Sequence, residues 1–125
     1  MDLGFDTIGN ATIIAYDTKP VLVTDPWITG TAYFGSWTLA HEIPAEQLEA
    51  IKQCEYVWLS HGHPDHLSMA SLQLLKDKKI LLADHVGGRI AGDLGRMGFN
   101  VSVLGDREWT NLSPRINVVC VPDYN

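Results

Sequence analysis

The sequence has no apolar run approaching the ~20 residues that a helix needs to cross a bilayer. Its first ten residues, MDLGFDTIGN, are acidic and lack the basic start and long apolar stretch of a secretory signal. Internal repeats, low-complexity tracts and Gly/Ser linkers are also absent from the sequence. These absences predict one cytoplasmic domain over residues 1–125 with no membrane partner. A chain of 125 residues is long enough to bury a hydrophobic core.

Basic residues are few, since nine Lys and Arg stand against fifteen Asp and Glu and give a formal net charge of −6. Neutralising the phosphates of a nucleic acid requires clustered basic side chains. The single basic cluster, KDKK at residues 76–79, is interpreted as the solvated end of a helix, where cations favour the helix dipole. The composition therefore argues against a nucleic-acid partner.

Cysteine is scarce, with only Cys54 and Cys120, which are far apart and form no CxxC pair. Two such residues support neither a disulfide framework nor a zinc knuckle. Both are expected to be small buried hydrophobes on strands or at helix ends.

The apolar pattern predicts an α/β fold with helices packed against a mixed sheet, because a hairpin is followed by alternating strands and helices. The hairpin has the β-branched runs ATIIAYD and VLVTD, and Ser68 is a good N-cap for the next-to-last helix. A long aromatic loop is predicted over residues 26–44. The expected strands are 11–17, 21–25, 55–60, 80–84, 101–104 and 116–121, and the expected helices lie within 44–54, 69–79 and 86–98.

Three of the five histidines and an aspartate are crowded into HGHPDH, residues 61–66, directly after the apolar run YVWLS. In α/β sheets, catalytic groups gather where a strand's carboxyl end meets the following loop. His61 and His63 project to the same side of extended backbone, and Gly62 leaves that space uncrowded. Asp65 and His66 follow from the turn. Imidazole and carboxylate groups suit zinc, and also iron or manganese, so the pattern predicts a site for one or two such ions.

This motif also carries a resemblance to a known family. HGHPDH is similar to the HxHxDH signature of the metallo-β-lactamase fold superfamily, and the hairpin ending in VLVTDPW resembles that superfamily's N-terminal strand pair. The aromatic segment DPWITGTAYFGSWTLAHEIP with VWLSHGHPDHLS resembles, more narrowly, a branch that includes CMP-N-acetylneuraminate hydroxylases. L-ascorbate-6-phosphate lactonases and N-acylphosphatidylethanolamine phospholipase D are more distantly similar. The resemblance runs from about Gly9 to the chain end and implies the N-terminal half of an αββα sandwich.

The resemblance also implies a role for each matching residue. His61 and His63 are expected to bind one metal ion, and Asp65 and His66 to help bind a second. Asp25, which matches the hairpin aspartate, is expected to support the metal site without binding the ion. In a hydrolase of this superfamily, a metal-bound water attacks the substrate, and Asp65 is the catalytic residue expected to orient that water.

The sequence departs from the family pattern where further ligands are expected. No histidine occurs near VVCVPDYN, where the third ligand of the first metal ordinarily lies, so Asp123 or Asn125 would have to replace it. His85 is a possible substitute ligand, although a loop role is favoured. His41 is interpreted as lining a pocket or capping the helix that starts near Pro44. The second half of the superfamily fold, with its bridging carboxylate and last histidine, has no counterpart here.

The aromatic loop allows two interpretations. Trp27, Phe34 and Trp37 either pack over the hairpin as a small additional core or, together with His41, line a substrate cleft above the metals. Arg89, beside two glycines, is interpreted as a surface arginine in preference to an anion ligand.

The leading hypothesis is a metal-dependent hydrolase that attacks a phosphodiester, lactone or ester of a small molecule. Hydroxylation of a nucleotide sugar ranks lower, because the resembling hydroxylase uses an additional iron–sulfur domain for which no Cys/His pair exists here. The alternative is a catalytically inert metal-binding module. A half-fold leaves one sheet face and one edge uncovered, so we expect a homo-oligomer or a partner that completes the fold.

Overall fold

The computed structural model describes residues 2–9, 11–30, 35, 39, 42–62, 66–84 and 88–121. Three helices and eight strands are assigned within these ranges. The strands are β1 (Leu3–Gly9), β2 (Thr12–Asp17), β3 (Lys19–Thr24), β4 (Tyr56–Leu59), β5 (Lys79–Ala83), β6 (Asn100–Leu104), β7 (Trp109–Ser113) and β8 (Ile116–Val119), and the helices are α1 (Ala45–Gln53), α2 (Met69–Gln73) and α3 (Arg89–Arg96).

Six strands form one mixed sheet in the order β1-β2-β3-β4-β5-β6. The first three strands pair antiparallel, and β3, β4, β5 and β6 pair parallel, each parallel connection passing through one helix. The predicted α/β class and mixed sheet are therefore confirmed. Because β3, β4 and β5 run parallel, their carboxyl ends meet at one edge of the sheet.

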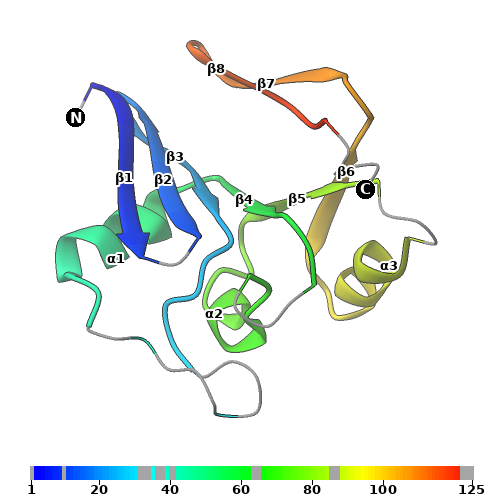
Figure 1. Cartoon of the computed structure of the whole chain (residues 1–125), viewed down its shortest axis with the longest axis horizontal. Coiled ribbons are helices and arrows are strands. Elements are labelled where there is room, and N and C mark those ends of the chain that lie inside the picture. The colour runs from blue at the N-terminus through cyan, green and yellow to red at the C-terminus, as the bar shows by residue number, and fades with distance from the viewer. Residues whose placement is uncertain are drawn as a thin grey trace.

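The two faces of this sheet are covered differently (Figure 1). The helices cover one face, where residues of α1, α2 and α3 join the sheet in the larger buried cluster, which includes Ile51, Leu72 and Leu94. The hairpin of β7 and β8 lies over the opposite face, where Leu112 packs with Leu22 and Leu81 of the sheet in a smaller cluster. The alternation of side chains along each strand produces this division.

The sequence patterns missed two strands, β1 and β7. In β1, Gly4 and Gly9 are poor strand formers, and four of its seven residues are exposed while none is buried, so the strand shows no buried apolar alternation. In β7, WTNLS contains a single buried apolar residue, Leu112. Both strands depend on a hairpin partner, β2 and β8 respectively, and not on their own composition.

The helix predicted over 69–79 is shorter in the structure. Ser68 caps it as expected, since the Ser68 hydroxyl accepts a hydrogen bond from the Ser71 amide at 3.3 Å, but α2 ends at Gln73. The interpretation of KDKK as a solvated helix end is wrong. Lys79 begins β5, and Lys78 is buried and donates from Nζ to the carbonyl of Lys52.

A polar clamp fixes the β7–β8 hairpin to the sheet. The buried carboxylate of Asp17, at the end of β2, accepts hydrogen bonds from Ser113 Oγ at 2.7 Å and from Arg115 Nε at 2.7 Å. Arg115 also bonds Asp2 at 2.9 Å. The hydroxyl of Ser113 and the guanidinium of Arg115 hold the pKa of Asp17 below its usual value, because both stabilise the ionised form.

Cys54 and Cys120 differ in burial. Cys54 ends α1 as predicted, is fully buried, and directs its thiol at the Ala50 carbonyl. Cys120, which follows β8, is only partly buried. Burial raises the pKa of the Cys54 thiol to about 12.

This difference predicts that the two thiols react separately. The raised pKa keeps the Cys54 thiol protonated near neutral pH, whereas the thiolate is the nucleophile. Titration of the folded chain with a disulfide reagent is expected to modify Cys120 alone, and denaturant is expected to release the second thiol. Equal rates for both thiols in the folded chain would contradict the burial of Cys54.

No helix in the described part of the chain combines the length and the apolar character needed to cross a bilayer.

Candidate functional site

The site lies at the edge of the sheet where β3 and β4 end. Asp25 directly follows β3, and Ser60 and His61 directly follow β4. The parallel register aligns Thr24 with Trp58, and the Asp25 amide donates to the Trp58 carbonyl at 2.7 Å. The backbone pairing of two adjacent strands therefore places Asp25 beside the histidine-bearing loop.

The backbone of Asp25 adopts an unusual conformation that is held by neighbouring groups. Its φ of 38° lies in the left-handed region, which aspartate tolerates better than most residues. The Thr12 hydroxyl donates to the Asp25 carbonyl at 2.8 Å and accepts from the Trp27 amide at 3.3 Å. These contacts turn the chain at the end of β3 and keep the Asp25 side chain buried.

Both oxygens of the Asp25 carboxylate are engaged by the loop after β4. Oδ1 accepts the Ser60 amide at 2.7 Å, and Oδ2 accepts the Ser60 hydroxyl at 2.8 Å. Oδ2 also lies 2.9 Å from His66 Nδ1. A buried carboxylate thus fixes one end of the loop at Ser60 and the other end at His66.

The two described histidines of the motif lie against each other. The ring centroids of His61 and His66 are 4.1 Å apart, with the planes tilted by 40°. His61 Nδ1 lies 2.8 Å from Ser60 Oγ, and His66 Nδ1 lies 2.9 Å from the Asp25 carboxylate. With Nδ1 used in these hydrogen bonds, Nε2 is the ring nitrogen through which either side chain would bind a metal.

The structure thus brings together three of the predicted site residues, Asp25, His61 and His66. Trp27 is buried, and its indole N–H donates to the Gly30 carbonyl at 3.2 Å, which favours packing over a role in a cleft. The other candidates lie outside the described residues. These are His63, Asp65, Phe34, Trp37, His41, His85, Asp123 and Asn125.

The donor set of the described residues fits part of a transition-metal site. Histidine nitrogen is a preferred ligand of zinc and iron. The ring nitrogen that does not bind the metal commonly forms a hydrogen bond with a carboxylate. Within the described ranges, no group of three or more His, Cys, Asp or Glu side chains is placed to hold an ion. A complete site therefore requires further ligands, and His63 and Asp65 occur in the same loop.

Ser60 is a site residue that the sequence patterns did not single out. Its hydroxyl lies within hydrogen-bonding distance of Asp25, His61 and His66, at 2.8, 2.8 and 3.3 Å. The available signal was its position, directly between the apolar run of β4 and the first histidine, which put it at the sheet edge with the other groups.

A pocket of about 580 Å³ borders the same loop on the side of α3. Gly62 and Leu67 contribute to one wall, and Ile90 and Asp93 of α3 contribute to the other. Arg89 lies at the pocket and is exposed, as predicted, with a loose ion pair to Asp93 at 3.8 Å.

Comparison with known proteins settles the family. Residues 4–78 match the sequence profile of the metallo-beta-lactamase superfamily. The chain belongs to that superfamily. The expected resemblance is therefore confirmed.

The curated relatives of the chain include cytidine monophosphate-N-acetylneuraminic acid hydroxylases. The protein of Danio rerio is 30% identical over 108 residues, which cover 82% of this chain and 18% of the relative. The protein of Xenopus laevis is 38% identical over 66 residues, which cover 53% of this chain and 11% of the relative. The chain thus spans about a fifth or less of the length of these two relatives.

Among solved structures, the metallo-beta-lactamase fold of this chain is similar to CmlA, a diiron beta-hydroxylase from Streptomyces venezuelae. The TM-score is 0.72 at 19% identity, and the match covers 94% of this chain and 23% of that chain. This match shows that the fold is shared.

Proposed function

We propose that the chain carries one part of the metal centre of a metal-dependent enzyme, built on the loop after β4. The observation that supports this proposal most strongly is the pair of adjacent imidazoles, His61 and His66, held by Asp25 and Ser60 through Nδ1. Hydrogen bonds to the ring nitrogen that does not bind the metal orient metal-binding histidines in proteins generally.

In this proposal, the metal ligands are His61, His63, Asp65 and His66. Asp25 does not bind the metal but contacts Nδ1 of His66 and so orients its ring. A bound zinc, iron or manganese ion would supply Lewis acidity, and iron would add redox chemistry with oxygen. The chain's own residues orient the ligands: Asp25 fixes His66, and Ser60 fixes the start of the loop through its amide. The burial of Asp25 strengthens both contacts, because water does not compete for its oxygens.

For the reaction class, we propose oxidative hydroxylation of a small molecule, with iron as the metal. The support comes from the names of the relatives, which are hydroxylases, and from the shared fold with a diiron beta-hydroxylase. Hydrolysis of a phosphodiester, lactone or ester, with Asp65 orienting the attacking water, is the second candidate. It is supported by the resemblance of HGHPDH to the HxHxDH signature of the superfamily, whose profile matches residues 4–78.

Two assays on the 125-residue chain separate these reaction classes. The iron-loaded chain is expected to consume oxygen in the presence of a reductant, and His61→Ala is expected to abolish this. Glu49→Gln, an exposed change on α1, is the control. Zinc-dependent turnover of bis-p-nitrophenyl phosphate that is lost in His61→Ala would favour the hydrolase instead. Stoichiometric metal without either activity would favour an inert metal-binding module.

We also propose that the chain self-associates through the sheet face opposite the helices. The exposed side chains of Leu3, Phe5 and Ile13 are 53, 65 and 37% accessible. Cross-strand register aligns Phe5 with Ala15, and Ala15 with Leu22 of the smaller buried cluster. The apolar face therefore continues beyond the β7–β8 hairpin across β2 to β1.

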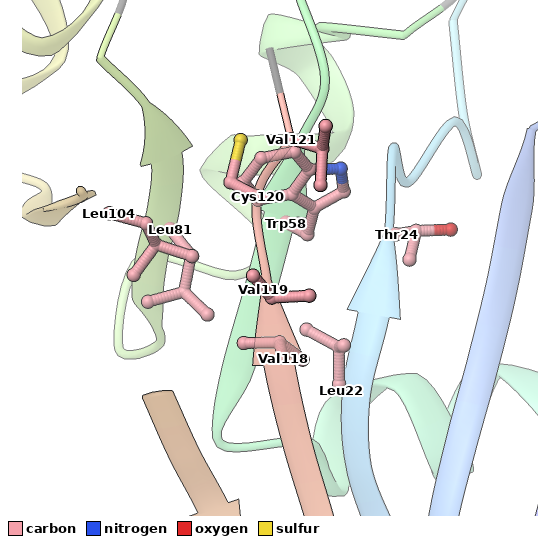
Figure 2. A pocket seen from close by; sticks show the side chains of 9 residues that line it. All are labelled: Leu22, Thr24, Trp58, Leu81, Leu104, Val118, Val119, Cys120 and Val121. Atoms are coloured by element: carbon pink, nitrogen blue, oxygen red, sulfur yellow. The ribbon is translucent and has the colours of Figure 1, made fainter. Parts of the chain in front are cut away.

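The hairpin also leaves a hollow in its own part of this face. An apolar pocket of about 350 Å³ lies there. Its lining side chains come from β3, β4, β5, β6 and the end of the hairpin (Figure 2). This pocket and the exposed apolar side chains of β1 and β2 lie on the same face of the sheet, which supports a second copy of the chain as the occupant.

Light scattering coupled to gel filtration tests this self-association. We expect a dimer at micromolar concentration, and we expect Phe5→Lys to convert it to a monomer by placing a charge on the apolar face. Met97→Lys, which charges an exposed apolar residue after α3, is the control and is expected to leave the dimer intact. A wild-type monomer would contradict the proposal and would favour a different partner for this face.

A further inference from the structure

We propose that β1 is a docking edge that pairs antiparallel with β1 of a second copy of the chain, so that two sheets join edge to edge across a twofold axis. This pairing gives the proposed self-association, on which it rests, a defined geometry. Three features of β1 carry it: the direction of its backbone groups, the place of its side chains and the position of its charges.

Strand β1 forms one edge of the six-stranded sheet (Figure 1). Its inner side pairs with β2, and within the described residues no strand pairs with its outer side. An edge strand presents a row of backbone N–H and C=O groups that can pair with another chain. Another strand can therefore be added at the outer side of β1.

The pairing with β2 shows which backbone groups point outward. The Asp2 carbonyl accepts a hydrogen bond from the Thr18 amide, so the backbone groups of Asp2 point inward. In an antiparallel pair, hydrogen-bonded and non-hydrogen-bonded positions alternate along each strand. The N–H and C=O groups of Leu3, Phe5 and Thr7 therefore point away from β2, toward the open edge.

The same three residues carry the exposed side chains of the strand. Leu3, Phe5 and Thr7 lie on the sheet face opposite the helices, whereas Ile8 packs against the larger buried cluster on the helix side. Strand β1 contains neither lysine nor proline, which proteins commonly place on an edge to prevent pairing. An open edge with alternate apolar side chains is the feature that recognition by strand addition uses.

An antiparallel pair of two β1 strands can use every outward group. When Phe5 faces Phe5 of the second copy, Leu3 faces Thr7 in both directions, and each facing pair exchanges two N–H···O bonds. The Thr7 carbonyl has a weak competitor, an exposed contact of 3.4 Å from Gln47 Nε2, which a strand amide would replace. The two phenyl rings then meet on the apolar face, where aromatic pairs stabilise neighbouring strands.

Charge favours this register over the two adjacent ones. With the twofold axis at Phe5, Asp6 faces Gly4 of the second copy. With the axis moved to Gly4, Asp6 would face Asp2, and with the axis at Asp6 the two Asp6 carboxylates would face each other. Like charges directly opposite each other destabilise a pair of strands. The sequence of β1 therefore fits an antiparallel copy of itself with its centre at Phe5.

A proline at position 7 blocks the edge and leaves the apolar face intact. Proline is tolerated in an edge strand where the lost N–H faces away from the sheet. Thr7→Pro keeps Leu3, Phe5 and Ile13, but it removes the bond that Thr7 donates to Leu3 of the second copy. Thr7→Val, which keeps the N–H, is the matched control.

Light scattering coupled to gel filtration, run over a series of protein concentrations, measures the dimer, and circular dichroism checks that each variant folds. We expect Thr7→Pro to raise the dissociation constant of the dimer at least about tenfold, because two hydrogen bonds are lost across the twofold axis. Thr7→Val is expected to match the wild-type chain.

Disulfide cross-linking supplies a second readout that needs no proline. Facing hydrogen-bonded residues of an antiparallel pair have Cα atoms about 5.5 Å apart, within the ~4.4–6.8 Å that a disulfide spans. In a Cys120→Ser chain, which lacks the partly buried thiol, Phe5→Cys is expected to form a reducible dimer under mild oxidation. Ile13→Cys, on the same face but one strand further in, is expected to stay monomeric in denaturing electrophoresis.

The outcomes separate this pairing from the self-association on which it rests. A wild-type monomer would contradict both. A wild-type dimer that Phe5→Lys dissociates and Thr7→Pro leaves intact would overturn the edge pairing alone and would favour contact through the sheet face. Cross-linking of Ile13→Cys without cross-linking of Phe5→Cys would overturn the edge pairing in the same way.

Discussion

Replacing Asp25 by asparagine is expected to lower the affinity of the chain for a transition metal by roughly 10–100-fold, as for other carboxylates that hold a ligating histidine. Replacing His66 by alanine is expected to lower it by at least about 100-fold, because a ligand is lost together with its support. Asparagine fills nearly the same space as aspartate and tolerates the left-handed backbone at this position, so the Asn variant mainly removes the charge behind His66.

Competition with a chelator of known affinity measures these losses. The matched control is Asp17→Asn, which neutralises the other buried carboxylate of the sheet, where the partners are Ser113 and Arg115 and not histidines. That control is expected to keep the wild-type affinity. Equal affinities for wild type and Asp25→Asn would mean that Asp25 does not support a metal ligand.

Removal of Leu72 from the core is expected to lower the stability of the chain strongly. Leu72 lies on α2 and is fully buried in the cluster between the helices and the sheet. Leu72→Ala is expected to lower the free energy of unfolding by about 2–5 kcal/mol, through lost apolar burial and a residual cavity. This loss is a large share of the ~5–15 kcal/mol that holds an average domain folded.

Leu74, two residues after Leu72, is the matched control, because it is also a leucine but its side chain is 58% exposed. Leu74→Ala is expected to change the free energy of unfolding by less than about 0.5 kcal/mol. Urea unfolding of the three chains, followed by circular dichroism, measures both values. A similar small loss in both variants would contradict the placement of α2 against the sheet.

The central part of the fold was predictable because its signals are local. The β-branched runs of β2 and β3 and the buried runs of β4 and β5 stand out from their flanks, and Ser68 marks the start of α2. The alternation of strands and helices then requires parallel pairing, which is what the sheet shows.

Elements that depend on distant partners could not be predicted. Strand β1 has exposed apolar residues and internal glycines, and its pairing with β2 alone defines it. The early end of α2 and the burial of Lys78 are similar cases. Lys78 Nζ finds its partner in the carbonyl of Lys52, a residue of α1 that is 26 positions away, and no local pattern in KDKK reveals that contact.

The site, too, has residues that local sequence patterns predict and contacts that depend on distant partners. The histidine motif is contiguous, so its residue types and its place after β4 were visible in the sequence. The link from Asp25 to His66 spans 41 positions, and only the family resemblance suggested it. The role of Ser60 was hidden, because a serine before a histidine has no meaning until the carboxylate of Asp25 is placed beside it.

Metal content tests the central claim most directly. The chain would be incubated with Zn(II), or with Fe(II) under anaerobic conditions, and unbound metal would be removed by desalting. The bound metal would then be quantified by inductively coupled plasma mass spectrometry. Wild-type protein is expected to retain at least one ion per chain, and His61→Ala and His66→Ala are expected to retain essentially none. A wild-type chain that folds but retains neither metal would contradict the assignment of this loop as a metal centre.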